Sequence, residues 1–328
     1  MSGPRCRRRV FPFLLTVTVL IAAGCSGGDT HITKGGGPEK ASITIGMLPL
    51  PEVAPIQIAI DKGYFKEQGL TVTAEIISGG AAALPDLATG KLDVLHSNYV
   101  SALLATAGGA AKIKVVAEAY AAKPDNFVLM TKKDSPIQKL PDLKGKMVGV
   151  NTLNNVATLA VSALLKTAGL TPADIKFFEK PFPEMAGALD SGTVDAAVMP
   201  EPFWQVAQQE KGARVLSQLF TGATADFPMA GYLVTEKFAQ QNPQTVAAFQ
   251  RGLRKAVELA ISNPGEVKAA LGKYTKIKPA TTDLLALGGF STSVDPTRLQ
   301  RVADLMLEYG YLKTKFNASS MLLAKGTS

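Results

Sequence analysis

Cysteine and histidine are scarce in this chain of 328 residues, which has two of each. Cys6 and Cys25 both lie close to the N-terminus, so the remainder of the chain has no disulfide and no thiol chemistry available. His31 and His96 are far apart in the sequence, and a metal site would have to rely on carboxylates, which nowhere cluster at ligand spacing. We therefore expect neither a metal site nor a cofactor.

Charge of one sign and long apolar runs are also lacking. The chain has 35 basic and 27 acidic residues, and four of the basic residues are arginines within the first nine positions. The small excess that remains is spread out, without a basic stripe or interleaved aromatic residues, which argues against nucleic-acid binding. No apolar run after the N-terminus is long enough to span a bilayer.

The N-terminus has the pattern of an export signal. Arginines between Arg5 and Arg9 precede a short apolar stretch from Val10 to Ala23, which predicts a signal peptide over residues 1–24. The sequence Ile-Ala-Ala-Gly before Cys25 resembles a bacterial lipobox, with Ala22 where leucine is commonest, and this resemblance implies acylation of Cys25. The alternatives are an ordinary secretory signal cleaved nearby and a twin-arginine signal at Arg8 and Arg9.

A glycine-rich polar stretch follows Cys25. Its composition predicts a flexible tether over residues 25–41, because it offers no core to bury. We therefore expect an exported protein that is lipid-anchored to the cell membrane and faces the outside or the periplasm.

The rest of the chain repeats itself with an offset of about a hundred residues. Each copy has three predicted strands separated by helical stretches, and each contains the spacing Leu-x-x-Gly-x-x-Asp, beginning at Leu87 and at Leu189. The strands are expected at 43–48, 71–77 and 94–96 in the first copy, and at 147–150, 175–178 and 196–199 in the second. Alternating strands and helices favour parallel sheets covered by helices on both faces.

Two doubly wound α/β lobes joined by a two-strand hinge are the predicted fold. The chain passes into the second lobe near 126–132 and returns near 226–232. We assign 42–122 and 230–328 to lobe one and 123–229 to lobe two. Two crossings of this kind form the hinge of a clam-shell binding protein.

Several segments in order resemble one protein family. Ala59–Leu70 is similar to the A-x-D-K-G-Y-F-x-x-x-G-L segment of ABC-transporter solute-binding proteins of the nitrate, sulfonate and taurine class. Ser78-Gly79-Gly80, Leu140–Lys146 and Pro200–Phe203 resemble further motifs of that family. The resemblance implies a type II periplasmic-binding-protein fold and a monomer that delivers a small-molecule solute to the transmembrane subunits of an ABC permease.

Ligands in such folds sit beyond the carboxyl ends of the strands, which nominates the loops there. The candidate solute-binding residues are Pro49, Leu50, Ser78, Gly79, Gly80, Ser97, Asn98, Tyr99, Asn151, Thr152, Asn154, Glu201 and Pro202. Backbone N–H groups at Gly79 and Gly80 are placed to meet an anion at a helix N-terminus. For the serine and asparagine side chains, plain helix capping is the alternative role.

The charge of these loops predicts a small, polar and nearly neutral pocket. They contain no arginine, which disfavours sulfate or phosphate as the solute. Glu201 would repel an anion, so it is expected to bind either a hinge group or a cationic end of the solute.

The main alternative is an enzyme of the same fold in pyrimidine or quinone precursor synthesis. The cysteine-rich motif of the thiamine-pyrimidine enzymes is absent, and a nucleophile–base pair would depend on His96 alone. A transcription-factor effector domain shares this two-lobed fold too, but the chain has an export signal and lacks a helix-turn-helix. We therefore expect a binding protein and no enzyme.

Overall fold

The computed structural model describes residues 37–323. The predicted leader (1–24), the predicted lipid site at Cys25 and most of the predicted tether (25–41) lie outside the described residues. Among the helices of the described range, none is both long and apolar enough to cross a membrane.

Six strands form the first sheet. They are β1 (Ser42–Met47), β2 (Thr71–Ile76), β3 (Val94–Asn98), β4 (Ile113–Ala121), β10 (Pro228–Thr235) and β11 (Gly289–Phe290). Their order across the sheet is β11-β4-β10-β3-β1-β2. β1 is parallel to β2 and β3, whereas β10 is antiparallel to both of its neighbours, β3 and β4.

Five strands form the second sheet. They are β5 (Phe127–Thr131), β6 (Met147–Val150), β7 (Lys176–Glu179), β8 (Ala196–Pro200) and β9 (Arg214–Gln218). Their order is β7-β6-β8-β5-β9, with β6 parallel to β7 and β8, and β5 antiparallel to β8 and β9.

The two sheets therefore repeat one topology, as the internal duplication predicts. In each sheet a parallel trio is followed by one antiparallel strand, β10 in the first and β5 in the second. Each of these strands belongs to a crossing, since β5 follows β4 and β10 follows β9. The expectation of parallel sheets is corrected for these strands. A chain that arrives from the other half of the fold enters the sheet where the carboxyl ends of the parallel strands lie, so its own strand runs antiparallel to them.

The shared Leu-x-x-Gly-x-x-Asp spacing has a structural explanation. An Oδ2 atom of Asp93 accepts the backbone N–H of Thr44 on β1 at 3.0 Å, and Asp195 accepts that of Met147 on β6 at 2.8 Å. Gly90 and Gly192 precede them with positive φ angles of 80° and 76°, which glycine adopts without steric cost. The motif thus ties the turn before a third strand to the start of the first strand.

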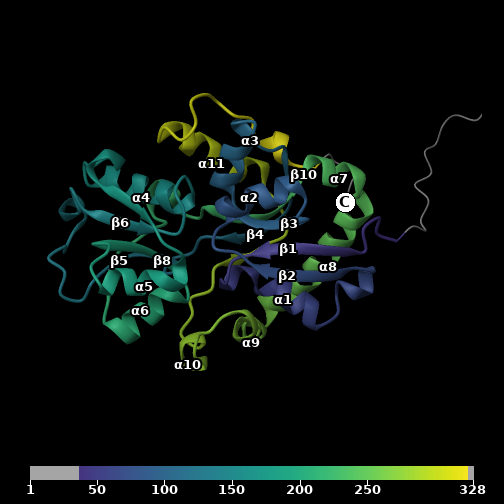
Figure 1. Cartoon of the computed structure of the whole chain (residues 1–328), viewed down its shortest axis with the longest axis horizontal. Helices are drawn as coiled ribbons and strands as arrows, with labels where there is room; N and C mark the ends of the chain where they lie inside the picture. Colours follow the sequence, from purple (N-terminus) through teal and green to yellow (C-terminus); the bar gives the residue numbers. More distant parts are fainter. Residues whose placement is uncertain (1–36, 324–328) are drawn as a thin grey trace, which may run out of the picture. The chain divides into compact units, whose positions relative to one another are not determined.

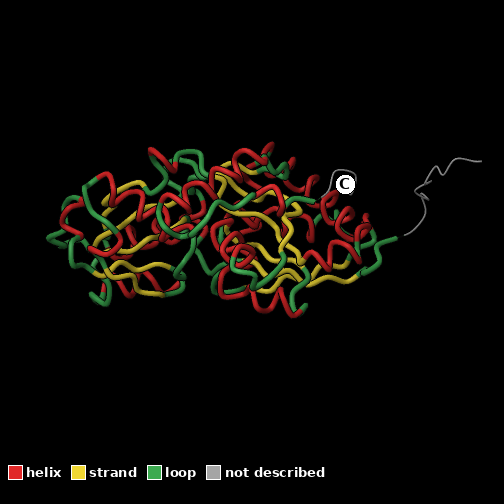
Figure 2. Tube along the Cα trace, turned by 90° about the horizontal axis from the view of Figure 1, so that it is seen from above, coloured by secondary structure: helices red, strands yellow, loops and turns green. Residues whose placement is uncertain are grey.

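Helices flank both sheets. They are α1 (Ala54–Asp61), α2 (Gly80–Thr89), α3 (Tyr99–Ala107), α4 (Val156–Thr167), α5 (Phe182–Asp190), α6 (Phe203–Lys211), α7 (Glu236–Gln241), α8 (Pro243–Ser262), α9 (Pro264–Tyr274), α10 (Pro279–Thr282) and α11 (Pro296–Glu308). In Figure 1, α2 and α3 lie above the strands of the first sheet and α1 and α9 below them, while α4 lies above and α5 and α6 below the second sheet. Figure 2 shows the strands in yellow with helices in red around them.

The segment 59–70, which carries the strongest family resemblance, fixes the packing of α1. Phe65 is buried and stacks on Phe249 of α8 with ring centroids 5.4 Å apart. Gly252 allows this approach, because a Cβ there would lie 2.6 Å from the Phe65 ring. α1 ends at Asp61, and Gly69 caps the 3₁₀ turn Lys66–Gln68 that follows it.

Residues 275–288, which we call the strap, contact the second half of the fold, although α9 before them and β11 after them pack with the first half. They follow α9, which packs against α1, yet they contact residues on and before α6. Lys278 pairs with Glu210 at 2.8 Å, and the Thr281 hydroxyl lies 3.2 Å from Gln209. The sequence predicts two connections between the halves, and the contacts of the strap are an addition to them. The lobe boundaries themselves stay a prediction.

Candidate functional site

A cavity lies where the carboxyl ends of strands from both sheets meet, and we call it the cleft cavity. It is lined by Leu48, Leu50, Glu52, Gly80, His96, Asn98, Phe127, Asn151, Asn155, Val156, Phe182, Met229 and Ala230. Its volume is about 30 Å³, which is room for one or two water molecules and too little for an organic solute. Any such solute therefore requires the surrounding loops to separate.

A second, smaller cavity, the hinge cavity, lies beside it. Its lining is Leu50, Pro51, Glu52, Tyr120, Asn126, Phe127, Pro200 and Glu201. Leu50, Glu52 and Phe127 border both cavities, so the two spaces share a wall. The crossing between β4 and β5 supplies Asn126 and Phe127, which places the hinge cavity at a connection between the sheets.

The structure brings five of the thirteen predicted residues to these cavities: Leu50, Gly80, Asn98, Asn151 and Glu201. Pro49 lines a separate, larger pocket of about 500 Å³ together with Pro183, Phe203 and Tyr274. The other predicted residues do not line any of these three spaces; they are Ser78, Gly79, Ser97, Tyr99, Thr152, Asn154 and Pro202.

Several of these other residues hold the loops of the two sheets together. A Cβ on Gly79 would lie 2.6 Å from Cγ2 of Thr152, so the loop after β2 and the loop after β6 are in contact. The Ser101 hydroxyl, in the first turn of α3, donates to the carbonyl oxygen of Asn154 at 3.3 Å. Loops from both copies of the duplication thus converge, as predicted.

Gly80 and Tyr99 are required by close packing. A Cβ on Gly80 would lie 2.3 Å from the Ser97 hydroxyl and 2.9 Å from the Ser97 Cα, so α2 can approach β3 only with glycine at its first position. Tyr99 is fully buried against Gly231 of β10. The α2 N-terminus has no side-chain cap, which leaves its first N–H groups available to an acceptor.

Asn98 is the N-cap of α3. Its Oδ1 accepts the backbone N–H of Ser101 at 2.9 Å, which is the capping role weighed as the alternative for this residue. Its side chain also borders the cleft cavity. Asn98 therefore borders the cavity, but its side-chain oxygen Oδ1 already accepts the hydrogen bond that caps α3.

Asn155 organises the loop after β6, and the sequence analysis missed it. Its Oδ1 caps α4 by accepting the N–H groups of Ala157 and Thr158 at 3.0 and 3.1 Å. Its Nδ2 donates to Asn151 Oδ1 at 2.7 Å and to Thr152 Oγ1 at 2.9 Å. Asn151, Thr152 and Asn154 are the residues predicted for this loop, whereas the capping residue is the next one along the chain, Asn155. Asn151 is held in place by it.

Glu52 and His96 are buried at the cleft cavity, and the analysis of the sequence did not assign them to the site. Their relative exposures are 5% and 1%, and Oε1 of Glu52 lies 3.5 Å from Nε2 of His96. Burial raises the pKa of the Glu52 carboxyl to about 8 and lowers the pKa of the His96 imidazole to about 3. A signal for Glu52 was present, because it is the only charged residue between Lys40 and Asp61.

Glu201 borders the hinge cavity and anchors the strap. Its Oε1 accepts the backbone N–H of Ala286 at 3.0 Å and is 3.4 Å from Nε2 of Gln205. Asn126 donates to the carbonyl oxygen of Ala286 at 2.6 Å. Burial raises the pKa of Glu201 to about 8. Glu201 thus holds the strap through Oε1, while its Oε2 is buried without a hydrogen-bond partner, and its role toward a solute stays a prediction.

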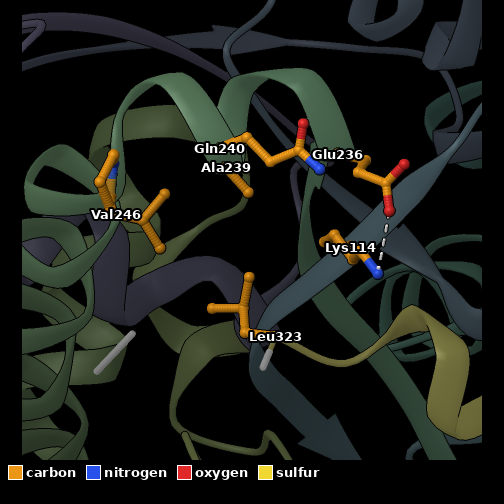
Figure 3. A pocket seen from close by; sticks show the side chains of 7 residues that line it. Lys114, Glu236, Ala239, Gln240, Val246 and Leu323 are labelled. Atoms are coloured by element: carbon orange, nitrogen blue, oxygen red, sulfur yellow. Dashed lines mark ion pairs between the residues drawn. The ribbon is translucent and has the colours of Figure 1, made fainter. Parts of the chain in front are cut away.

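A further pocket of about 330 Å³ lies away from the cavities (Figure 3). It is lined by Lys114 of β4, by residues of α7 and α8, and by Leu323. Lys114 and Glu236 form an ion pair of 3.2 Å across it, so the charges offset one another. None of the predicted solute-binding residues reaches this pocket.

The described lining of the site contains acidic side chains and no strongly basic ones. Among the described residues, no lysine or arginine lines the cleft cavity or the hinge cavity, and the ionisable carboxyls there are Glu52 and Glu201. No group of three or more His, Cys, Asp or Glu residues within 37–323 has metal-binding geometry.

Comparisons with known proteins agree with this architecture. Residues 50–267 match the family described as NMT1/THI5 like. The 4-amino-5-hydroxymethyl-2-methylpyrimidine phosphate synthase THI13 of Saccharomyces cerevisiae is 25% identical, and the match covers 74% of this chain and 72% of that protein. The riboflavin-binding protein RibY of Chloroflexus aurantiacus is 26% identical over 70% of this chain and 65% of its own length.

A solved structure shares the fold. The alkanesulfonate-binding protein SsuA from Xanthomonas axonopodis pv. citri, bound to MOPS, superposes with a TM-score of 0.74 at 19% identity. The superposition covers 87% of this chain and 99% of the other. The predicted fold class, two α/β lobes of the periplasmic-binding-protein type, is thereby confirmed.

Proposed function

This chain belongs to the NMT1/THI5-like family, and from this premise we propose that it is the solute-binding component of an ABC importer. The observation that carries the proposal is the cleft cavity, which is lined by residues of both sheets at the carboxyl ends of their strands. That is the position at which open α/β sheets bind ligands.

Capture by closure is the mechanism that this geometry supports. Solute enters while the loops are apart, and the halves then rotate about the β4–β5 and β9–β10 connections until both sets of loops contact it. The small volume of the cleft cavity fits the closed end of this motion. The closed form is the one that the transmembrane subunits of the permease would accept.

Export and anchoring complete the proposal. The arginine-rich N-terminus and the segment before Cys25 support secretion and acylation, so the binding domain would be tethered to the outer face of the cell membrane. SsuA, which shares the fold, is an alkanesulfonate-binding protein. We propose that this chain binds its solute in the same way, as a solute-binding protein, and acts as a monomer.

The test is a titration of the domain from Ser26 onward with alkanesulfonates, taurine, nitrate, riboflavin and pyrimidines. Trp204 is the only tryptophan, and its Nε1 donates to the carbonyl oxygen of Asp125 in the first crossing at 2.9 Å, so its fluorescence should report hinge motion. A solute at a hundred times its dissociation constant should stabilise the fold by about 2.7 kcal/mol. If none of these solutes changes the Trp204 fluorescence or the melting temperature, the proposal is contradicted.

An enzyme is the second candidate, because the family also includes the yeast synthases and His96 is buried beside a carboxyl group. A low pKa keeps His96 neutral, as a general base requires, but its Nε2 is directed at Glu52, and a hydroxyl or thiol to activate is missing from the lining of the cleft cavity. Turnover of a pyrimidine or quinone precursor, followed by mass spectrometry, would favour this candidate over reversible binding.

A further inference from the structure

The pair formed by Glu52 and His96 has hydrogen-bonding capacity that the described protein does not use. Oε2 of Glu52 and both ring nitrogens of His96 are buried and have no hydrogen-bond partner. The 3.5 Å separation between Glu52 Oε1 and His96 Nε2 is too long for a good hydrogen bond. Buried polar groups are ordinarily paired, because an unpaired one keeps its full desolvation cost. Three atoms without a partner in the protein therefore face one cavity, where they can bond whatever fills it, water or solute.

The surroundings of the pair determine the charge of that partner. The titratable groups around it are Tyr120, Tyr232, Tyr274 and Glu201, none of which can act as a cation. The ring of Tyr232 lies 5.8 Å from that of His96, and its hydroxyl is also buried without a partner. Within the described residues, nothing with a positive charge lines either cavity. Ionised Glu52 would thus be an uncompensated buried charge.

We propose that Glu52 binds a cationic nitrogen of an organic solute, an ammonium or amidinium group, with the free ring nitrogen of His96 accepting a second N–H. The inference rests on the proposed function and specifies the solute class of the same site. On binding, the carboxyl of Glu52 gives its proton to solvent and the solute cation takes its place. A buried carboxylate paired in this way is strongly favoured over one left alone.

The same geometry disfavours a solute that is only an oxyanion. Such a solute would find no side-chain cation in the lining of either cavity to offset its charge, and its charge would further oppose ionisation of Glu52 and Glu201. The uncapped N-terminus of α2 can receive an acceptor group, and Gly80 at its first position lines the cleft cavity. A solute with an acceptor at one end and a cationic nitrogen at the other matches both features.

The experiment compares matched solutes that differ only in the nitrogen. Taurine is paired with isethionate, and benzamidine with benzamide, using calorimetry and melting temperature in buffers that contain neither amines nor sulfonates. We expect only the cationic member of at least one pair to bind, with release of about one proton per solute near neutral pH, measured with a pH-stat. The apparent affinity should rise about tenfold per pH unit up to the pKa of Glu52.

Substitutions locate the effect. Glu52→Gln should weaken binding of the cationic member at least tenfold and abolish proton release, since the amide cannot supply a countercharge. Glu52→Asp keeps the charge and should retain proton release with lower affinity, which separates loss of charge from loss of folding. Glu258→Gln, on an exposed position of α8, is the matched control and should leave affinity and melting temperature unchanged.

The outcomes distinguish this inference from the proposed function. Equal binding of a solute and its nitrogen-free partner, or unchanged affinity in Glu52→Gln, would overturn the role of Glu52 while a solute-binding function stands. Absence of binding by both pairs would overturn the cationic-nitrogen inference, and the wider titration followed by Trp204 would then decide the function.

Discussion

Replacing Glu52 by glutamine tests the electrostatics of the cleft without any ligand. The substitution keeps the shape of the side chain and removes its titration. Burial raises the pKa of Glu52 from 4.5 to about 8. Between these two pH values the carboxyl group is protonated in the folded protein and ionised in the unfolded chain. The stability associated with this proton is present at low pH and is lost as the pH rises through the folded pKa. Since one pKa unit is about 1.4 kcal/mol, the wild type should lose about 3 kcal/mol relative to the variant between about pH 5 and about pH 8.

Urea unfolding of both proteins across this pH range measures the effect. The difference between them isolates Glu52, because Glu201 titrates in both proteins and burial moves the pKa of His96 to about 3, below the window. The pKa values of the neighbouring tyrosines are raised, above the window. Glu258→Gln serves as the control and should run parallel to the wild type. Parallel profiles for Glu52→Gln itself would refute the reasoning, because they would mean that Glu52 has no raised pKa in the folded protein.

Three further substitutions test other parts of the structure. Asn155→Ala removes the cap of α4 and the bonds that hold Asn151, so it should cost about 3 kcal/mol in chemical denaturation and also weaken solute binding; an unchanged midpoint would contradict the capping role. Gly80→Ala forces a Cβ against Ser97 and should cost about 2 kcal/mol, seen as a lower melting temperature; a rise would show that α2 can shift away freely. Cys25→Ser should move the protein from the membrane fraction to the soluble fraction, and continued retention would refute the lipid anchor.

The repeated topology could be predicted because both copies of the duplication contain the same residue types at the same spacing. Asp93 and Asp195 sit at equivalent places, and each one accepts a backbone N–H of the first strand of its copy. The two crossings, near 126–132 and 226–232, could be predicted because these segments lie outside the two repeated units. The relative directions of the strands could not be predicted, since the residue pattern of a strand is the same whether its neighbours are parallel or antiparallel.

The site was predicted less completely, for two physical reasons. The loops were located by topology, but which side chain of a loop faces inward depends on local turns that no sequence period records. Glu52 is an example, because the predicted loop stopped at Leu50 and the cavity reaches one turn further. The strap could not be anticipated, since its contacts with Glu201 and Gln209 depend on residues distant in the sequence and on a helix, α10, of only four residues.

The antiparallel strand at the centre of the first sheet has a consequence for the order of assembly. β10 separates β3 from β4, yet it comes after every strand of the second sheet, and β11 is the one strand of the first sheet that follows it. A chain that emerges from its N-terminus can therefore complete the second sheet, which is contained within residues 127–218, before the first sheet obtains its middle strand. Folding of the first sheet must wait for contacts that are distant in the sequence, which are slow to form.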